Sequence, residues 1–198
     1  IVVDYEHTWA SEVGWEQEFG QAVTADITFF YKELRDLIID NPNFGSTDNA
    51  APFINQGEGR VQGMEFMLRR ARVDRFFGWL SYTLSKSERR DDPTDPDGWY
   101  DFDFDQTHIF TGVGGLDLPR DRSISGRVQY VTGNPYTPYD TGIYDMDQDS
   151  YLGFATGPRN GERMPPYYAI DFRIDKLRTF KRWQLETYVD FLNVVHGI

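Results

Sequence analysis

The stretch "YYAIDFRID", residues 167–175, alternates apolar and charged side chains with a period of two. The apolar parity is Tyr168, Ile170, Phe172 and Ile174, and the other parity is Ala169, Asp171, Arg173 and Asp175. Successive side chains leave an extended backbone on opposite sides, so the segment predicts a β-strand with two unlike faces. The apolar face either covers a soluble core or meets lipid while the charged face lines a wet lumen. This strand alone is compatible with both arrangements.

The composition narrows the class of protein. The 198 residues suffice for one domain, and 32 acidic against 20 basic residues give a net charge of -12. Nucleic acid is therefore not expected as a partner, because phosphate binding needs a basic surface. The aromatic content of 16% is mostly Tyr and Phe, which suit strands and membrane interfaces. Cysteine is absent, so no disulfide, thiol nucleophile or Cys-ligated metal is available.

The same alternation recurs along the chain. It predicts strands over about residues 8–18, 23–37, 63–69, 76–85, 104–118, 124–130, 167–175 and 183–191. Short turns alternate with three long loops, at about residues 40–53, 87–103 and 133–165. In an up-and-down meander this order puts every short turn at one end and every long loop at the other, as in outer-membrane barrels. We expect an all-β fold: an antiparallel up-and-down meander of about eight long strands, several long enough to span a bilayer.

The stretch "NQGEGRVQGMEFMLRR", residues 55–70, resembles a sequence signature of a known family. Its pattern of Asn55, Gly57, Gly59, Arg60, Gly63 and Glu65 resembles a strand signature in the C-terminal half of TonB-dependent receptors. The stretches "EVGWEQEF", "YKELRDLI", "DFDQTHIF", "TGNPYTP", "YYAIDFRIDK" and "YVDFLNVV" continue the likeness in family order. The glycines suit a place where strands bend or approach closely.

The resemblance implies that residues 1–198 form one domain, a partial segment of a large transmembrane β-barrel, with no plug domain and no final strand. It implies import of a siderophore-like metal chelate or another scarce nutrient across the outer membrane of a Gram-negative bacterium. The implied partners are outer-membrane lipid, the small nutrient ligand, and the TonB complex acting through a plug outside this chain. No cofactor and no enzymatic activity are expected.

Two alternatives remain open at this point. One is a soluble eight-stranded β-barrel that binds a carbohydrate or small ligand, and the other is a non-transporting structural barrel of the outer membrane. Detergent dependence separates the soluble barrel from the transporter. A plug domain ahead of Ile1 would separate the transporter from the structural barrel.

Candidate site residues follow from the two faces and the loops. Six charged residues are expected to line the lumen: Glu65, Arg69, Asp171, Arg173, Glu186 and Asp190. Five loop aromatics are candidate ligand contacts, although an interfacial belt explains them equally well: Trp99, Tyr100, Tyr136, Tyr139 and Tyr144.

No metal or catalytic site is expected. Asp145, Asp147 and Asp149 have calcium-loop spacing, but Ser150 replaces the turn glycine and Thr156 the bidentate glutamate. The acidic run from Asp91 to Asp105 is interpreted as solvated. The three histidines share no metal-ligand spacing: His7, His108 and His196. No catalytic triad or phosphate loop is recognisable.

Overall fold

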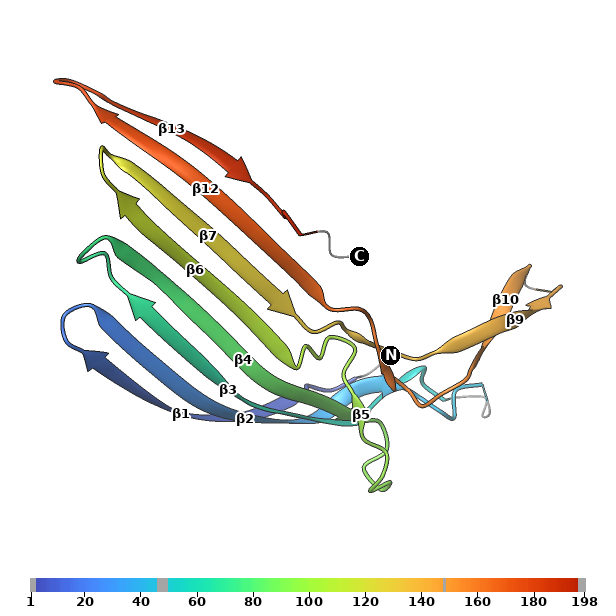
Figure 1. Ribbon diagram of the computed structural model, residues 1–198. Coiled ribbons are helices and arrows are strands. Elements are labelled where there is room, and N and C mark those ends of the chain that lie inside the picture. Colours follow the sequence, from blue (N-terminus) through green and yellow to red (C-terminus); the bar gives the residue numbers. More distant parts are fainter. Residues whose placement is uncertain (1–2, 46–49, 148, 196–198) are drawn as a thin grey trace.

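The computed structural model describes residues 3–45, 50–147 and 149–195; His196 lies outside them. Eight long strands form one antiparallel sheet in chain order (Figure 1). They are β1 (His7–Phe19), β2 (Val23–Asp40), β3 (Phe53–Arg70), β4 (Phe76–Arg90), β6 (His108–Leu118), β7 (Arg122–Val131), β12 (Tyr167–Thr179) and β13 (Gln184–Phe191). The expected meander of about eight long strands is confirmed.

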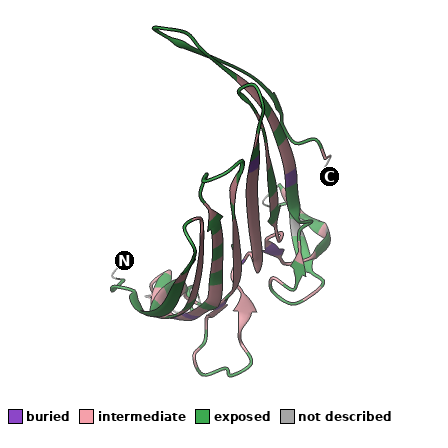
Figure 2. Ribbon diagram, turned by 60° about the vertical axis from the view of Figure 1, so that its left-hand side comes forward, coloured by how far each residue is buried: buried purple, intermediate pink, exposed green. Residues whose placement is uncertain are grey.

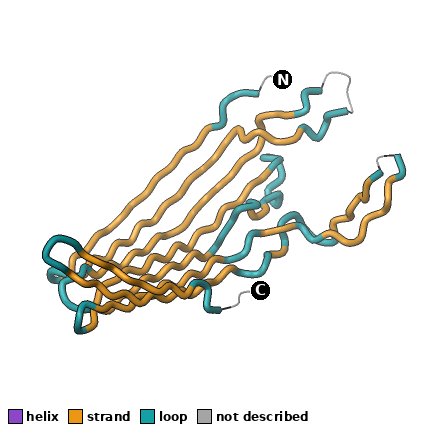
Figure 3. The backbone as a smooth tube through the Cα atoms, turned by 90° about the horizontal axis from the view of Figure 1, so that it is seen from above, coloured by secondary structure: helices purple, strands orange, loops and turns teal. Residues whose placement is uncertain are grey.

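The short turns lie together at one end of the sheet and the long loops at the other (Figures 1 and 3). The loop end carries the remaining strands. β5 (Tyr100–Asp101) pairs with the end of β4, β8 (Pro135–Tyr136) pairs with β11 (Glu162–Arg163), and β9 (Tyr139–Asp145) pairs with β10 (Ser150–Ala155) in a projecting hairpin. The long connection expected over residues 133–165 is present and, in its described residues, contains four short strands of its own.

Two strand starts also differ from the sequence-based expectation. β3 begins at Phe53, well before residue 63, because the signature segment pairs with the far end of β2. β6 begins at His108 and not near residue 104, because the preceding residues form a turn in which Asp105 donates its backbone N–H to the carbonyl of Phe102.

The sheet is a single curved layer without a hydrophobic core (Figure 2). Among the described residues the only buried apolar side chains are Ala169, at 2% exposure, and Pro135 in the loop strand β8. Phe172 and Val189 are 51% and 56% exposed, so no second layer covers their face. The pairing order runs from β1 to β13 without closing, which is not the closed eight-stranded barrel of the soluble alternative. Within the described part of the chain, no helix is long and apolar enough to cross a membrane.

Candidate functional site

One face of the sheet, called the apolar face below, is built from uncharged rows that run across the strands. Strand register places seven aromatic or aliphatic residues side by side: Trp15, Ile27, Phe66, Tyr82, Phe110, Tyr130 and Tyr168. The next row toward the short turns contains Ala25, Leu68, Leu80, Gly112, Val128 and Ile170. The alternation seen in one strand is therefore a property of the whole sheet.

The apolar face has defined limits along the strands. On β4 its parity is uncharged from Phe76 to Leu84 and becomes charged at Lys86, and on β2 it is uncharged from Val23 to Tyr31. Each span covers about 26 Å of strand at roughly 3.3 Å per residue, or about 20 Å along a barrel axis for a tilt near 40°. This height is close to the roughly 25 Å apolar band of outer-membrane barrels. We call these spans the apolar band.

Ion pairs replace apolar residues on the same face beyond the band, toward the long loops. Glu88 lies 2.5 Å from Arg60 and 2.7 Å from Lys86. The Arg60 guanidinium lies 4.2 Å from the centre of the Trp99 ring, and that of Arg90 4.8 Å. This chemistry suits a strand segment that extends out of hydrocarbon into water.

The opposite face, called the polar face, carries an ionic cluster on β12 and β13. Arg173 lies 2.6 Å from Asp175, 3.2 Å from Glu186 and 3.7 Å from Asp190. Asp171 lies 2.6 Å from Arg127 and accepts a hydrogen bond from the backbone N–H of Asn193. Four of the six lumen candidates thus lie together: Asp171, Arg173, Glu186 and Asp190. The arrangement gives the polar face alternating charges of both signs.

The other two lumen candidates lie on β3, apart from this cluster. Glu65 is opposite Thr28 and Thr83, and Arg69 is opposite Thr24 and Trp79. Strands β4, β6 and β7 separate them from β12. They share the polar face but do not contact the ionic cluster.

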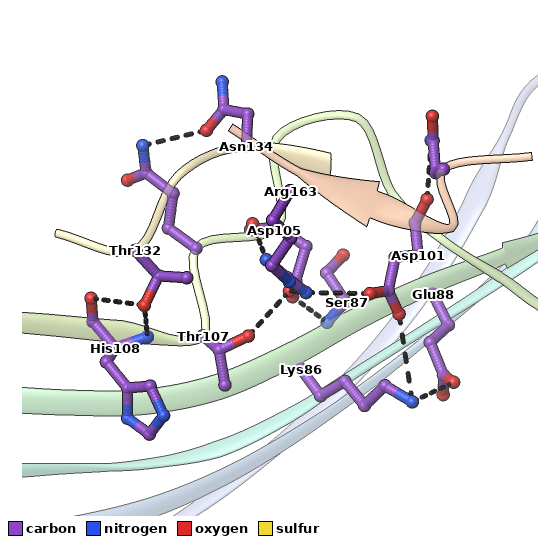
Figure 4. A network of polar contacts seen from close by, with 12 residues as sticks. Lys86, Ser87, Glu88, Asp101, Asp105, Thr107, His108, Thr132, Asn134 and Arg163 are labelled. Atoms are coloured by element: carbon purple, nitrogen blue, oxygen red, sulfur yellow. Dashed lines mark hydrogen bonds and ion pairs between the residues drawn. The ribbon is translucent and has the colours of Figure 1, made fainter. Parts of the chain in front are cut away.

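Two of the long loops are joined by a buried ion pair, shown in Figure 4. The Asp105 carboxylate, with none of its side chain exposed, lies 2.6 Å from an Arg163 nitrogen and accepts hydrogen bonds from the Ser87 backbone N–H and the Thr107 hydroxyl. Arg163, on β11, also reaches Asp101 at 2.7 Å. We call Asp101, Asp105 and Arg163 the loop clasp. The expectation that the whole acidic run is solvated is wrong for Asp101 and Asp105, because Arg163 compensates their charge.

Neighbouring contacts reinforce the loop clasp. Arg159 lies 2.6 Å from Asp91, and Asn160 donates hydrogen bonds to the Asp101 carbonyl and the Asp103 carboxylate. Side chains from residues 159–163 therefore bind both carboxylates and backbone carbonyls of residues 91–105. A connected network of this kind holds loops in one arrangement.

Beside the loop clasp, the polar face contains a pocket of about 400 Å³. The Arg89 guanidinium lies 4.1 Å from the Phe102 ring centre, and that of Arg159 lies 3.9 Å from the Tyr100 ring centre. Among the described residues, no carboxylate lies within ion-pairing distance of Arg89, which donates hydrogen bonds to the Ser87 hydroxyl and the Glu88 carbonyl. We call this the arginine–aromatic pocket. Five carboxylates and three arginines line the pocket, and Arg90 and Arg159 are paired with Glu58 and Asp91. The Arg89 guanidinium and the two rings suit an anionic, aromatic group of a ligand.

The structure distributes the five loop aromatics over different places. Tyr100 lines the arginine–aromatic pocket and donates its hydroxyl hydrogen to Asp91 at 2.6 Å. Burial, together with this hydrogen bond to a carboxylate, raises the pKa of Tyr100 above its ordinary value. Trp99 lies on the other side of the sheet, over Arg60.

The remaining three aromatics belong to the loop strands. The Tyr136 hydroxyl donates to Glu162, Tyr139 is 65% exposed, and the Tyr144 ring packs 5.2 Å from that of Tyr151. Of the five candidates, only Tyr100 lines the pocket. The part of the chain that the structure describes contains no group of three His, Cys, Asp or Glu residues placed to hold a metal ion.

The family follows from a match over nearly the whole chain. The family model "TonB dependent receptor-like, beta-barrel" matches residues 4–193. The chain belongs to this family. The receptor barrel segment also matches solved structures, whereas no curated protein matches it.

Three of these structures show the same fold. The ferric-catecholate import receptor Fiu from K12 E. coli, in its closed form, has a TM-score of 0.67 and 15% identity over 97% of this chain. The FrpB iron transporter from Neisseria meningitidis has a TM-score of 0.57 and 15% identity over 86%. The outer membrane transporter YddB from Escherichia coli has a TM-score of 0.64 and 13% identity over 97%. This chain spans 24%, 24% and 29% of their respective lengths.

The signature residues of the receptor segment have structural explanations. Gly57 faces an irregularity of β2 between Leu34 and Leu37, where Asp36 has a φ of 58°. A side chain at Gly63 would collide with the carbonyl of Leu84. The Asn55 side-chain amide donates to the carbonyls of Asp4 and Asp36, which joins the segment before β1 to the bend in β2. The signature glycines therefore lie where strands approach closely. The signature residue Arg60 forms the ion pair with Glu88 on the neighbouring strand.

Sequence reasoning did not select four residues that the structure places in the receptor's loop-end site: Arg89, Asp105, Arg159 and Arg163. Arg163 lies 58 positions from Asp105, so no local spacing connects them. The available signal was the pair Arg159 and Arg163 in one long loop and the acidic run in another.

Proposed function

We propose that this chain is part of the barrel of a TonB-dependent outer-membrane transporter that imports an anionic, siderophore-like metal chelate. The single observation that carries the proposal is the exposed apolar band, which every long strand continues and no second layer covers. Soluble monomers rarely expose continuous apolar patches of this extent, whereas a bilayer solvates them. The polar face then lines the water-filled interior.

The arginine–aromatic pocket supports an anionic ligand. Arg89 supplies a guanidinium for charge-assisted hydrogen bonds, whereas Arg159 is already paired with Asp91, and Tyr100 and Phe102 supply rings for stacking. The pocket lies at the long-loop end of the polar face, which is the external end in this protein class. The printed names of two structural neighbours, a ferric-catecholate import receptor and an iron transporter, support a ferric chelate as the ligand class.

The ligand would pass from the pocket along the charged polar face. Glu65, Arg69, Asp171, Arg173, Glu186 and Asp190 line this route in the proposal. The TonB complex would supply energy through a plug outside this chain. The mixed charges would keep the interior hydrated, because ionic side chains hold water better than apolar ones.

A binding measurement on the intact receptor tests the proposal. Purified receptor in detergent is titrated with a ferric tris-catecholate, and tryptophan fluorescence quenching gives the dissociation constant. We expect Arg89→Gln to weaken binding about tenfold, since a lost hydrogen bond to a charged group is worth roughly 1.5 kcal/mol. The matched control is Arg72→Gln, because Arg72 stacks on Phe77 at 3.7 Å near the short turns, far from the pocket.

Transport itself is tested by growth. A strain that depends on this receptor should grow on the ferric chelate under iron limitation only when TonB is present. Growth without TonB, or wild-type receptor that binds no ferric chelate of any tested class, would contradict the proposed function.

A further inference from the structure

The apolar face contains a hollow between β4, β6 and β7. Its volume is about 480 Å³, and the side chains around it are almost entirely apolar. Register places glycines at the same parity in adjacent strands: Gly78 opposite Gly114, Gly114 opposite Gly126, and Gly112 opposite Leu80 and Val128. The walls include Leu68, Phe76, Leu80, Phe110 and Val128. We call this hollow the glycine groove.

Packing within the chain explains some of these glycines and not others. A Cβ at Gly78 would collide with the carbonyl of Val113, so a close strand approach requires glycine there. At Gly114 the nearest atom to an added Cβ is Phe76 Cε2, at 3.9 Å, which is ordinary van der Waals contact. Strands favour bulky side chains, and an interior glycine often marks a bulge, a tight bend, or a close approach by a ligand or another backbone. The register of β6 with β4 and β7 has no shift at Gly114, so a bulge does not explain it. The groove is therefore open where the chain itself would tolerate a side chain.

Positive charge lies at the short-turn end of the glycine groove. Arg70 lines the groove; its Nε donates to the Phe76 carbonyl and its Nη2 lies 3.3 Å from Asp74. These contacts use two of the five N–H donors of a guanidinium. On the same parity and at the same end, the register adds three further basic residues: Arg122, Lys176 and Arg178. In a chain of net charge -12, this concentration of bases beside the apolar band is a local exception.

We propose that the glycine groove binds one acyl chain of an anionic phospholipid in the leaflet on the short-turn side, with the lipid phosphate at Arg70. The inference rests on the proposed function in one respect, namely that the apolar face lies in a bilayer. Charge complementarity selects the occupant. The groove supplies hydrocarbon contact, and Arg70, opposite Val23 where the apolar band ends on β2, supplies a phosphate partner. A protein partner would need a complementary surface wider than the groove.

Photolabelling of the intact receptor tests the site. The receptor is reconstituted in phosphatidylcholine vesicles that contain a small fraction of phosphatidylglycerol with a diazirine in one acyl chain, and labelled peptides are mapped by mass spectrometry. We expect label to concentrate on β4, β6 and β7 near the glycines. Gly114→Leu, which fills the groove, and Arg70→Gln, which removes the charge, should each lower that labelling severalfold. The matched control is Ala25→Leu, which adds a side chain of similar size to the same face on β2.

The outcomes separate the two proposals. Label spread evenly over the apolar face, or label unaffected by Gly114→Leu, would overturn the lipid site while leaving the membrane barrel intact. Equal labelling by a phosphatidylcholine probe of the same chain would overturn the selection of an anionic lipid, because phosphatidylcholine carries the same phosphate but no net charge. A groove free of label within a labelled face would mean that a protein or nothing covers it, and would also overturn the site. Absence of label from the entire apolar face would overturn the proposed function as well.

If the Gly114→Leu receptor fails to assemble, Gly112→Leu replaces it. The added Cβ at residue 112 would lie 3.3 Å from the Phe110 ring. The test then uses the labelling of Gly112→Leu and of Arg70→Gln.

Discussion

Replacing Leu80 by arginine places a charge in the middle of the apolar band. Leu80 lies on β4 midway between Phe76 and Leu84, in a row with Leu68 and Gly112. An arginine at the lipid-facing midplane of a barrel costs roughly 2 to 4 kcal/mol. Each 1.4 kcal/mol is a factor of ten, so the folding equilibrium constant should fall about 30-fold to 700-fold.

Neighbouring substitutions provide the comparison. Ser81→Arg puts the same side chain on the polar face one residue along the strand, and should have little effect on stability because that side chain reaches water. Leu84→Arg lies at the edge of the band, next to Lys86, where the cost falls to about 0 to 1 kcal/mol. Leu80→Gln separates the loss of an apolar side chain from the insertion of a charge.

Guanidinium unfolding of the intact receptor in phospholipid vesicles measures these differences. The expected order of destabilisation is Leu80→Arg, then Leu84→Arg, then Ser81→Arg. A Ser81→Arg receptor that is destabilised as much as Leu80→Arg would refute the assignment of the apolar face to lipid.

Three further predictions concern the loops and the strand approaches. Arg163→Met should leave the buried Asp105 carboxylate unpaired, at a cost of about 3 to 5 kcal/mol, and should speed proteolysis within residues 133–165. Adding Asp105→Asn should restore part of the resistance to protease. Wild-type resistance in the single variant would contradict the loop clasp. Gly63→Ala should destabilise the receptor by about 1 to 3 kcal/mol in denaturant titrations, because the added Cβ would collide with the Leu84 carbonyl. Gly114→Ala should be nearly neutral, and equal destabilisation by the two variants would count against the strand register. The raised pKa of the Tyr100 phenol should contribute stability that is fully present below the unfolded pKa of about 10 and is lost as pH rises through the higher folded pKa. The phenol therefore stays neutral near pH 10 in the folded receptor. The difference in absorbance between wild type and Tyr100→Phe should show no phenolate step near that pH.

The long strands were predictable because their signal is local. Within five residues, the alternation predicts that one face of the strand carries Tyr168, Ile170 and Phe172. The order of short and long connections then predicts the strand order without any knowledge of contacts. The pairing of the eight strands places the apolar residues of each strand next to those of its neighbours. The sequence predicts these apolar residues separately for each strand.

The loop end was less predictable because its order depends on contacts between distant segments. Asp105 resembles its neighbours in an acidic run until Arg163 approaches it from the next long loop. Trp99 and Tyr100 are adjacent in sequence, yet one packs on Arg60 outside the polar face and the other lines the arginine–aromatic pocket. Alternation continues there, but composition alone does not show which parity faces which side.

Solvent accessibility along β4 tests the central claim most directly. Residues 1–198 contain no cysteine. In a vesicle-reconstituted intact receptor whose remaining sequence is also kept free of cysteine, single cysteines at residues 79–84 can each carry a spin label. We predict that positions 80, 82 and 84 collide with oxygen dissolved in lipid and are shielded from a water-soluble nickel chelate, while positions 79, 81 and 83 show the reverse. Equal exposure of both sets to the nickel chelate, or the opposite phase, would contradict the account.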